Sequence, residues 1–396
     1  MSHIFARVLL ALIVLTAACT PLPPKPTVPP VAKPPPTPTG PESAQYQEVS
    51  FETLPGWSQA ALAPSLRAFL TGCGRPVTPL LIACELASQV TPGDEAGARK
   101  FFESQFTAYA LRSSTAGDTG LLTGYYEPVI DGARTRDAEH RFPIYGVPED
   151  LIIVDLGNVS QEVRGLRLRG RLEGRRLVPY YSRGELESRD VPAPVIAWAR
   201  DPVELAFLQI QGSGQIQFPN GERLRIGFAD QNGHPYRSIG RYLVDRGEMT
   251  LDQASMQNIK AWVAANPAKA REVLNANPSY VFFRERSELR IDEGPIGALN
   301  VPLTAGYSLA VDRRFVPLGA PVYLATNYPL SEERLERLMT AQDTGGAIRG
   351  VVRGDFYWGS GADAGAQAGR MRNQTRMWLL WPRSLALPRD PTATCC

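Results

Sequence analysis

The chain has 396 residues, of which 43% are hydrophobic and 21% are charged, so its composition is that of a globular protein with room for two domains. The formal net charge of +2 argues against a dedicated nucleic-acid-binding protein, which would carry a strong basic excess. Beyond the first 18 residues the only histidines are His140 and His234, and no pair of cysteines has zinc-site spacing. We therefore expect neither a metal nor a cofactor.

The first 18 residues are typical of a signal peptide. Arg7 precedes the apolar run VLLALIVL, which is too short to span a bilayer, and small residues then lead to Cys19. Cys19 has the position of the acylated cysteine of bacterial lipoproteins, although leucine is usual three residues before it. Thr20 follows instead of an aspartate, which by analogy with enteric lipoproteins predicts an outer-membrane lipoprotein that faces the periplasm. A secreted protein cleaved near the same place is the alternative.

Proline dominates the segment from Pro21 to Pro41, so residues 19–44 are predicted to form a lipidated cysteine and an extended polyproline II tether. At about 3.1 Å per residue the tether would reach roughly 60 Å. The composition is equally compatible with a spacer of no defined reach.

Apolar residues recur every three or four positions from Phe51 to Ser113, which predicts packing helices with a core of phenylalanines, namely Phe101, Phe102 and Phe106. Cys73 and Cys84 lie in this segment. In an oxidising compartment they can form a disulfide, but the sequence does not determine the pairing. Cys395 and Cys396 lie on a short tail.

Strand-like alternation with many glycines and prolines follows from Thr123 to Gly233 and predicts an all-β segment. A second helical pattern covers 251–278. From Val281 onward, short strands punctuated by proline and glycine predict a compact barrel. The pattern alone therefore predicts a mixed α+β protein.

The stretch AQDTGGAIRGVVRGDFYWGSG, Ala341 to Gly361, has the features of an active site. Its glycines permit a sharp turn, so we expect Asp343 and Asp355 on adjacent strands with carboxylates that face one cavity. A neighbouring carboxylate and nearby aromatic rings would raise the pKa of an aspartate, which is how a general acid is made. A solvated hairpin with ordinary surface aspartates is the alternative.

Strand alternation separates side chains that contact a ligand from side chains that fold the protein. Asp355 and Tyr357 should share a face opposite Phe356 and Trp358, so Trp358 is expected in the core. In LQIQGSG, read as a strand, Gln209 and Gln211 would share the polar face. Tyr125 and Tyr126 should point in opposite directions, and Tyr125 is the preferred ligand contact.

Three stretches resemble the membrane-bound lytic murein transglycosylase A family, which has three characteristic aspartates in its C-terminal part. They are LLTGYYEPVI, Leu121 to Ile130; the segment from Phe207 to Leu243; and the segment from Gly294 to Pro382. The resemblance implies a mainly β protein with flanking helices, in which a six-stranded double-psi β-barrel carries an inserted second β-domain with a groove between them. The implied boundaries are 45–122 and 236–388 for the helical segment and barrel, 123–235 for the insert, and 389–396 for a tail.

The same resemblance implies roles for individual residues. Its three aspartate positions fall on Asp312, Asp343 and Asp355, and its catalytic acid falls on Asp355, although the loop before Asp355 is about one residue longer than in the family. We expect Asp343 to support the acid and Asp312 to hold a turn of the barrel. Segments that line the family's saccharide groove fall on Thr123, Tyr125, Gln209, Gln211 and Ser213.

The implied activity is cleavage of peptidoglycan between N-acetylmuramic acid and N-acetylglucosamine, with a 1,6-anhydromuramic acid end as product. One aspartate would act first as general acid and then as base. Implied partners are glycan strands, the outer membrane through the lipid anchor, and other cell-wall enzymes.

Two alternatives come from other classes of protein. Asp118-Thr119-Gly120 and Asp343-Thr344-Gly345 both match the D-T-G tripeptide of aspartic peptidases, but no apolar strand precedes Asp118 and no internal repeat links the two halves. A lipid-anchored protein that binds peptidoglycan without cleaving it is the second alternative. A missing acid would favour it, and Asp355 is present.

Overall fold

The computed structural model describes residues 42–75, 78–156, 167–251, 253–290, 293–383 and 385–388. The expected signal peptide, Cys19, the tether as far as residue 41 and the C-terminal cysteines lie outside these residues. Residues 42–44, which were expected to end the tether, are described, and Ala44 begins strand β1 (Ala44–Val49). No helix in the described part of the chain is both long and apolar enough to cross a membrane.

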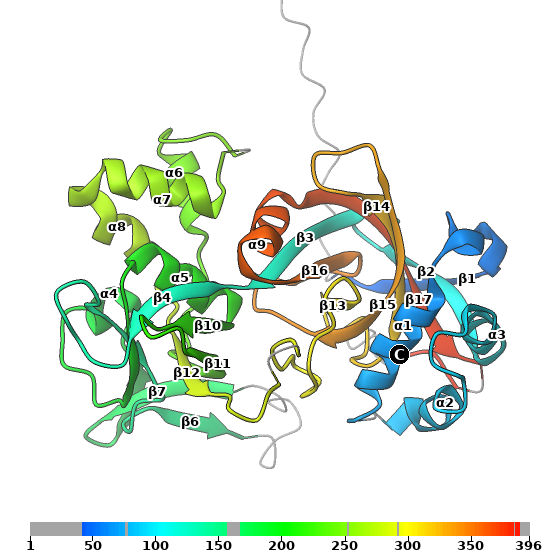
Figure 1. The fold of residues 1–396 in the computed structure, drawn as a ribbon, viewed down its shortest axis with the longest axis horizontal. Coiled ribbons are helices and arrows are strands. Elements are labelled where there is room, and N and C mark those ends of the chain that lie inside the picture. The colour runs from blue at the N-terminus through cyan, green and yellow to red at the C-terminus, as the bar shows by residue number, and fades with distance from the viewer. Residues whose placement is uncertain are drawn as a thin grey trace, which may run out of the picture. The chain divides into compact units, whose positions relative to one another are not determined.

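Six of the described strands close into a barrel (Figure 1). Around the ring the order is β17-β14-β15-β13-β16-β3, and β17 pairs with β3 to complete it. Two neighbouring pairs, β13 with β15 and β16 with β3, are parallel. The strands are β3 (Gly120–Glu127), β13 (Ser308–Val311), β14 (Pro321–Asn327), β15 (Arg334–Asp343), β16 (Arg353–Ser360) and β17 (Arg372–Pro382).

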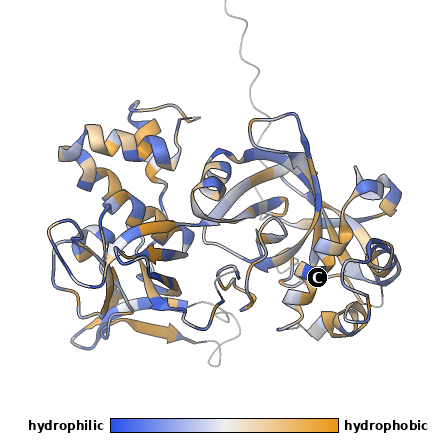
Figure 2. Cartoon of the chain, viewed as in Figure 1, coloured by the Kyte–Doolittle hydropathy of each residue, from blue (hydrophilic) through white to orange (hydrophobic). Residues whose placement is uncertain are grey.

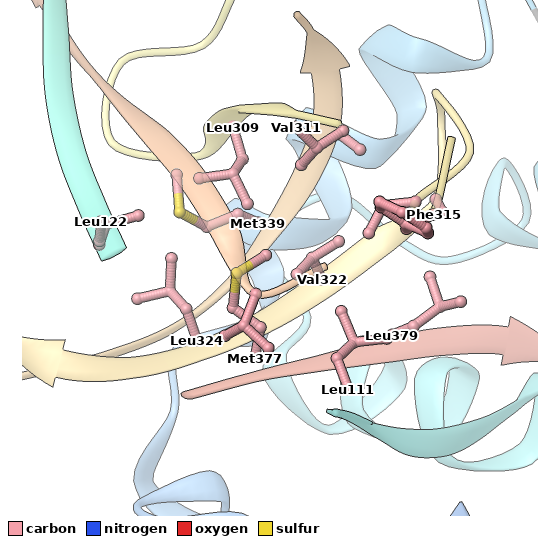
Figure 3. Packing of buried hydrophobic residues seen from close by; sticks show 14 of the residues in the cluster. Leu111, Leu122, Leu309, Val311, Phe315, Val322, Leu324, Met339, Met377 and Leu379 are labelled. Carbon is pink, nitrogen blue, oxygen red and sulfur yellow. The ribbon is translucent and has the colours of Figure 1, made fainter. Parts of the chain in front are cut away.

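Apolar side chains from every strand of the ring fill the barrel interior, and Figure 3 shows ten of the cluster's residues labelled. Burying a side chain of this size contributes roughly 1.5–3 kcal/mol. Because side chains alternate along a strand, the residues between these point out of the barrel. The buried set includes Leu122, Leu309, Val311, Val322, Leu324, Met339, Phe356, Met377 and Leu379.

Helices α1 (Leu62–Gly72), α2 (Leu81–Ala87) and α3 (Glu95–Gln105) come before the barrel strands, as the periodicity predicts. The phenylalanine core is confirmed, since Phe69, Phe101, Phe102 and Phe106 are buried in one cluster. The helical prediction is wrong beyond Gln105. There the chain becomes β2 (Phe106–Ser113), because its backbone pairs with β1 (Ala44–Val49) and with β17.

Helix α9 (Gly361–Arg370) packs against β3 and β16. The close approach depends on Gly124, where a Cβ would lie 2.6 Å from Trp358 Nε1 and 2.8 Å from Ala368 Cα. Glycine at this position therefore lets α9 lie directly on the strand that carries Thr123 and Tyr125.

A second sheet has the order β12-β11-β10-β4-β9-β5 within the described residues. Because β12 pairs with β11, this sheet extends past the expected boundary at residue 235 to Glu285. Its strands are β4 (Val129–Ala133), β5 (Phe142–Tyr145), β9 (Val195–Ala199), β10 (Ser213–Gln217), β11 (Arg223–Gln231) and β12 (Val281–Glu285).

The expectation that residues 123–233 are all β is wrong, because α4 (Arg183–Leu186) and α5 (Pro202–Gln211) lie within this segment. Helix α5 turns Leu205 and Leu208 toward the second sheet, and Val203 and Ala206 toward a helical cluster. The helical pattern predicted over 251–278 contains two helices, α7 (Met256–Ala265) and α8 (Ala270–Asn275). A helix before them, α6 (Ile239–Asp245), was not predicted.

A smaller sheet, β6-β7-β8, exposes aliphatic side chains. Leu168 and Leu172 are exposed, and Figure 2 colours β6 mainly as hydrophobic. The opposite face holds Arg169, which is paired with Asp230 of β11. The strands are β6 (Ile152–Asp155), β7 (Arg167–Glu173) and β8 (Arg176–Pro179).

Cys73 and Cys84 form a disulfide that links the end of α1 to α2. Replacing both by serine should lower the free energy of unfolding by about 3 kcal/mol, because a crosslink between residues 11 positions apart restricts the unfolded chain. Urea denaturation of the oxidised protein and of the double variant measures this difference. Equal denaturation midpoints would contradict a stabilising role for the disulfide.

Candidate active site

Asp343 and Asp355 both lie beside strand β13. Asp355 of β16 and Asp343 of β15 each pair with Ala310, one from either side. Asp343 reaches this position because β15 has a register shift after Ala341, and such bulges are common next to active sites. The prediction of adjacent strands is therefore wrong, since β13 separates the two, but both aspartates occupy the same outer face of the barrel.

The parallel pair β3–β16 builds the other half of this face. Asp355 pairs with Thr123, and Tyr357 pairs with Tyr125. The residues that alternate with them point into the barrel, where Phe356 is fully buried. The predicted alternation is confirmed in this segment: Asp355 and Tyr357 lie on the outer face of the barrel, and Trp358 packs against the barrel core.

The Thr123 hydroxyl donates a hydrogen bond of 2.5 Å from Oγ1 to Oδ1 of Asp355. Burial raises the pKa of Asp355 to about 6, and the negative charge of Asp343 adds to this effect. The Thr123 hydrogen bond and the positive charge of Arg353 act in the opposite direction. With this pKa about one molecule in ten is protonated at neutral pH, against about one in a thousand for an ordinary aspartate. The expected rise in pKa is confirmed, with burial as its first cause and the charge of Asp343 as a smaller one.

Burial also raises the pKa of Asp343 above its ordinary value. Two backbone N–H groups oppose this rise, because Thr344 and Ala298 each donate to Oδ1 of Asp343 at 2.9 Å. These bonds fix one carboxylate oxygen on the backbone. The arrangement fits a carboxylate that holds a loop and acts on its neighbour through its charge.

Tyr125 packs its ring 5.3 Å from the ring of Tyr357. Burial, followed by the charges of Asp343 and Asp355, raises the pKa of Tyr125 well above its ordinary value. The Tyr125 hydroxyl is buried and lies close enough to the Asp343 carboxylate for the two to affect each other's pKa. It is therefore a neutral donor close to both carboxylates. Tyr126 points the other way, into a cluster with α9, as predicted.

Asp312 is buried and lies in a turn, as expected. Its carboxylate accepts backbone N–H bonds from Arg314 at 3.2 Å and from Gly350 at 2.9 Å, and it pairs with the Arg314 guanidinium at 2.6 Å. Burial opposes ionisation, but these bonds lower the pKa of Asp312 below its ordinary value. Asp312 thus ties the end of β13 to the loop that leads to β16.

The interpretation of LQIQGSG as one strand is wrong, because Gln209 and Gln211 belong to α5 and only Ser213 begins β10. Gln209 is buried, whereas Oε1 of Gln211 accepts the backbone N–H of Tyr126 at 3.1 Å. The two glutamines therefore do not share a polar strand face. Gln211 lies next to the Tyr125–Tyr126 segment of β3, and Gln209 contributes to the interior.

Glu127, a residue to which no role was assigned from the sequence, joins the barrel to the second sheet. The side chain is completely buried, and its Oε2 atom accepts hydrogen bonds from Ser360 Oγ at 2.5 Å and from Gln215 Nε2 at 2.8 Å. It also pairs with Arg225 Nε at 3.2 Å. No local pattern marks this residue, because its partners lie on β10, β11 and β16.

Of the two D-T-G aspartates of the peptidase alternative, Asp118 is not part of this site. Asp118 is exposed in a turn before β3, whereas the carboxylate whose charge raises the pKa of Asp355 is that of Asp343, on β15. The described residues also contain no cluster of three or more His, Cys, Asp or Glu side chains that could hold a metal ion.

Two family models match the chain: the MltA specific insert domain over residues 121–284, and the 3D domain over residues 307–381. The membrane-bound lytic murein transglycosylase A of Escherichia coli strain K12 is 37% identical over 285 residues, which cover 70% of this chain and 70% of that protein. Its counterpart from Vibrio cholerae is 30% identical over 69% of this chain and 67% of its own length. The chain belongs to the MltA family.

Solved structures agree with this assignment. MltA from Neisseria gonorrhoeae is 40% identical with a TM-score of 0.77, and the match covers 87% of this chain and 95% of that one. E. coli MltA with bound chitohexaose is 28% identical with a TM-score of 0.65, over 85% and 94% of the two chains. The expected family fold is confirmed, a six-stranded double-psi barrel with a second β-domain, and this MltA family member is a lytic transglycosylase.

The replacement Asp343→Asn should lower the pKa of Asp355 below about 6, because it removes a negative charge that favours the protonated form. Carboxyl-carbon NMR titration of aspartate-labelled protein measures the change. Asp363→Asn, at an exposed site on α9, is the control and should leave the titration unaltered. An identical Asp355 titration in Asp343→Asn would contradict electrostatic coupling across β13.

Proposed function

We propose that this lytic transglycosylase cleaves the β-1,4 bond between N-acetylmuramic acid and N-acetylglucosamine in peptidoglycan, with Asp355 as its acid and base. The observation that carries the proposal is the environment of Asp355. Its pKa of about 6 keeps a protonated fraction available, and Thr123 and Tyr125 lie beside it on the same barrel face. Family membership supplies the substrate class.

The reaction would begin when protonated Asp355 donates to the oxygen between the two sugars, while positive charge develops on the anomeric carbon of the muramic acid. The resulting carboxylate would then take the proton from the six-hydroxyl of the same sugar. That hydroxyl closes on the anomeric carbon and gives a 1,6-anhydro end. Because the nucleophile is part of the substrate and already close, one carboxylate is sufficient.

Asp343 is assigned a supporting role in this mechanism. A hydrolase would use a second carboxylate to activate water or to attack the sugar. Oδ1 of Asp343 already accepts two backbone N–H bonds, and strand β13 stands between Asp343 and Asp355. Its charge can raise the pKa of the acid without contact with the anomeric carbon.

The glycan is proposed to cross the outer face of β3 and β16, in the groove expected between the barrel and the second domain. Thr123 and Tyr125 lie next to the acid, and the Tyr125 hydroxyl is a neutral donor for a sugar oxygen. Gln211 can offer its amide NH₂ group, since its carbonyl oxygen is bound to Tyr126. Ser213 follows on the same segment. Gln209 is buried and would support α5 from within.

The replacement Asp355→Asn keeps the shape of the side chain but removes its acid, so glycan cleavage should fall by at least 10²- to 10⁴-fold. The measurement is the release of 1,6-anhydro products from purified sacculi, followed by mass spectrometry. Asp363→Asn is the matched control and should retain activity. Near-normal release by Asp355→Asn would show that another residue is the acid, and products with free reducing ends would show that water is the nucleophile.

We also propose that Cys19 anchors the enzyme to the outer membrane and that the proline-rich segment is its tether. Cys19→Ala should abolish incorporation of labelled palmitate and release the protein from membranes, because several acyl chains at about 0.8 kcal/mol per buried methylene hold a lipoprotein firmly. A variant that lacks Cys395 and Cys396 is the control and should remain labelled. Unchanged fractionation of Cys19→Ala would contradict the anchor.

A further inference from the structure

Arg353 lies two residues before Asp355 on β16 and connects the two strands of the parallel pair. Its Nη1 atom donates to the carbonyl oxygen of Leu121 on β3 at 3.4 Å and to that of Gly354 on its own strand. Its Nη2 atom donates to Oγ1 of Thr123 at 2.9 Å. The guanidinium is partly buried and is held at the base of the candidate site by bonds to both strands.

These contacts determine the direction of the hydrogen bond between Thr123 and Asp355. A guanidinium has donors only, so Thr123 Oγ1 must act as acceptor toward Arg353. The threonine hydroxyl has a single proton, and the other close partner of Oγ1 is Oδ1 of Asp355, at 2.5 Å. The hydroxyl proton therefore points to Asp355, and Oδ1 of Asp355 is the accepting oxygen.

We propose that Arg353 is a positioning residue that acts through Thr123 to place the reactive proton of Asp355 on Oδ2. The acid would then donate from Oδ2 to the glycosidic oxygen, and the same atom would recover a proton from the sugar's six-hydroxyl. Oδ1 stays bound to Thr123 in both steps. This inference rests on the proposed function, because it assigns a direction to the proton transfer of Asp355.

Several charged and titratable groups surround Asp355. Arg353 from β16 lowers its pKa, and Asp343 from β15 raises it. Tyr125 and Tyr357, on β3 and β16, are neutral because the pKa of each is raised. Arg372 of β17 acts on Arg353. Removing the Arg353 charge should therefore raise the pKa of Asp355 and move the alkaline limb of the pH–activity profile to higher pH, since the acid must be protonated.

The first test compares Arg353→Met with Arg353→Lys and with Arg372→Met, which removes a neighbouring positive charge that does not bond to Thr123. We expect Arg353→Met to lower kcat about 10- to 100-fold through misorientation of the acid, with little change in KM. Its alkaline limb should move to higher pH. Arg353→Lys should restore the limb, because it keeps the charge, and Arg372→Met should leave both kcat and the limb close to wild type.

The second test asks whether Arg353 acts through the hydroxyl of Thr123. Thr123→Val removes the hydroxyl at nearly constant volume, and Thr123→Ser retains it. In the Thr123→Val background, Arg353→Met should reduce kcat less than about twofold further, because the hydroxyl that it orients is absent. An equal loss in both backgrounds would overturn the proposal. Should Arg353→Met fail to fold, normal kcat and an unmoved limb in Thr123→Val would overturn it.

Carboxyl-carbon NMR of aspartate-labelled protein separates this inference from the proposed function, because it needs no substrate. The Asp355 signal is identified by its loss in Asp355→Asn. A higher Asp355 pKa in both Arg353→Met and Thr123→Val supports the positioning role, and an unchanged pKa in both overturns it. An active Asp355→Asn variant, by contrast, would overturn the proposed function. The NMR titration would still measure the effect of Arg353 and Thr123 on the pKa of Asp355.

Discussion

The parallel pairing of β3 with β16 is the constraint on which the site depends. It places Thr123 opposite Asp355 and Tyr125 opposite Tyr357, although each pair is 232 residues apart along the chain. The same pairing directs the side chains of Leu122 and Phe356 toward the interior of the barrel, where both are buried. A shift by one residue would exchange the two faces, so the packing of the core fixes the alignment of the acid with its hydrogen-bond partner.

Burial dominates the electrostatics of this face. Burial is the largest cause of the raised pKa values of both Asp343 and Asp355, and for Asp355 the charge of Asp343 makes a smaller contribution. By contrast, Asp312 is also buried, yet bonds from Arg314 and Gly350 keep its pKa low. The three aspartates thus differ in pKa, because their hydrogen-bond donors differ in number and charge.

The C-terminal end of helix α5 was predicted to be a strand, although the segment is helical. Its sequence alternates polar and apolar residues at its C-terminal end, which suggested a strand. The helix signals lie at its two ends, where the Asp201 side chain caps the first turn, Pro202 occupies the first helical position, and Gly212 ends the helix with φ of 79°. Burial on two sides also explains the pattern, since α5 packs between a sheet and other helices.

The residue pattern by itself predicted that Asp343 and Asp355 belong to one site and that Asp355 alternates with Phe356. Resemblance to the family added the choice of Asp355 as candidate acid, the barrel and its inserted domain. These features depend on local residue patterns and on motifs that stay together along the chain. Only the tertiary structure decided that β13 separates the two aspartates, that Glu127 binds Arg225, and that Arg353 orients Thr123. Each of these results depends on the register of strands that are distant in sequence, and local propensity carries no information about such pairing.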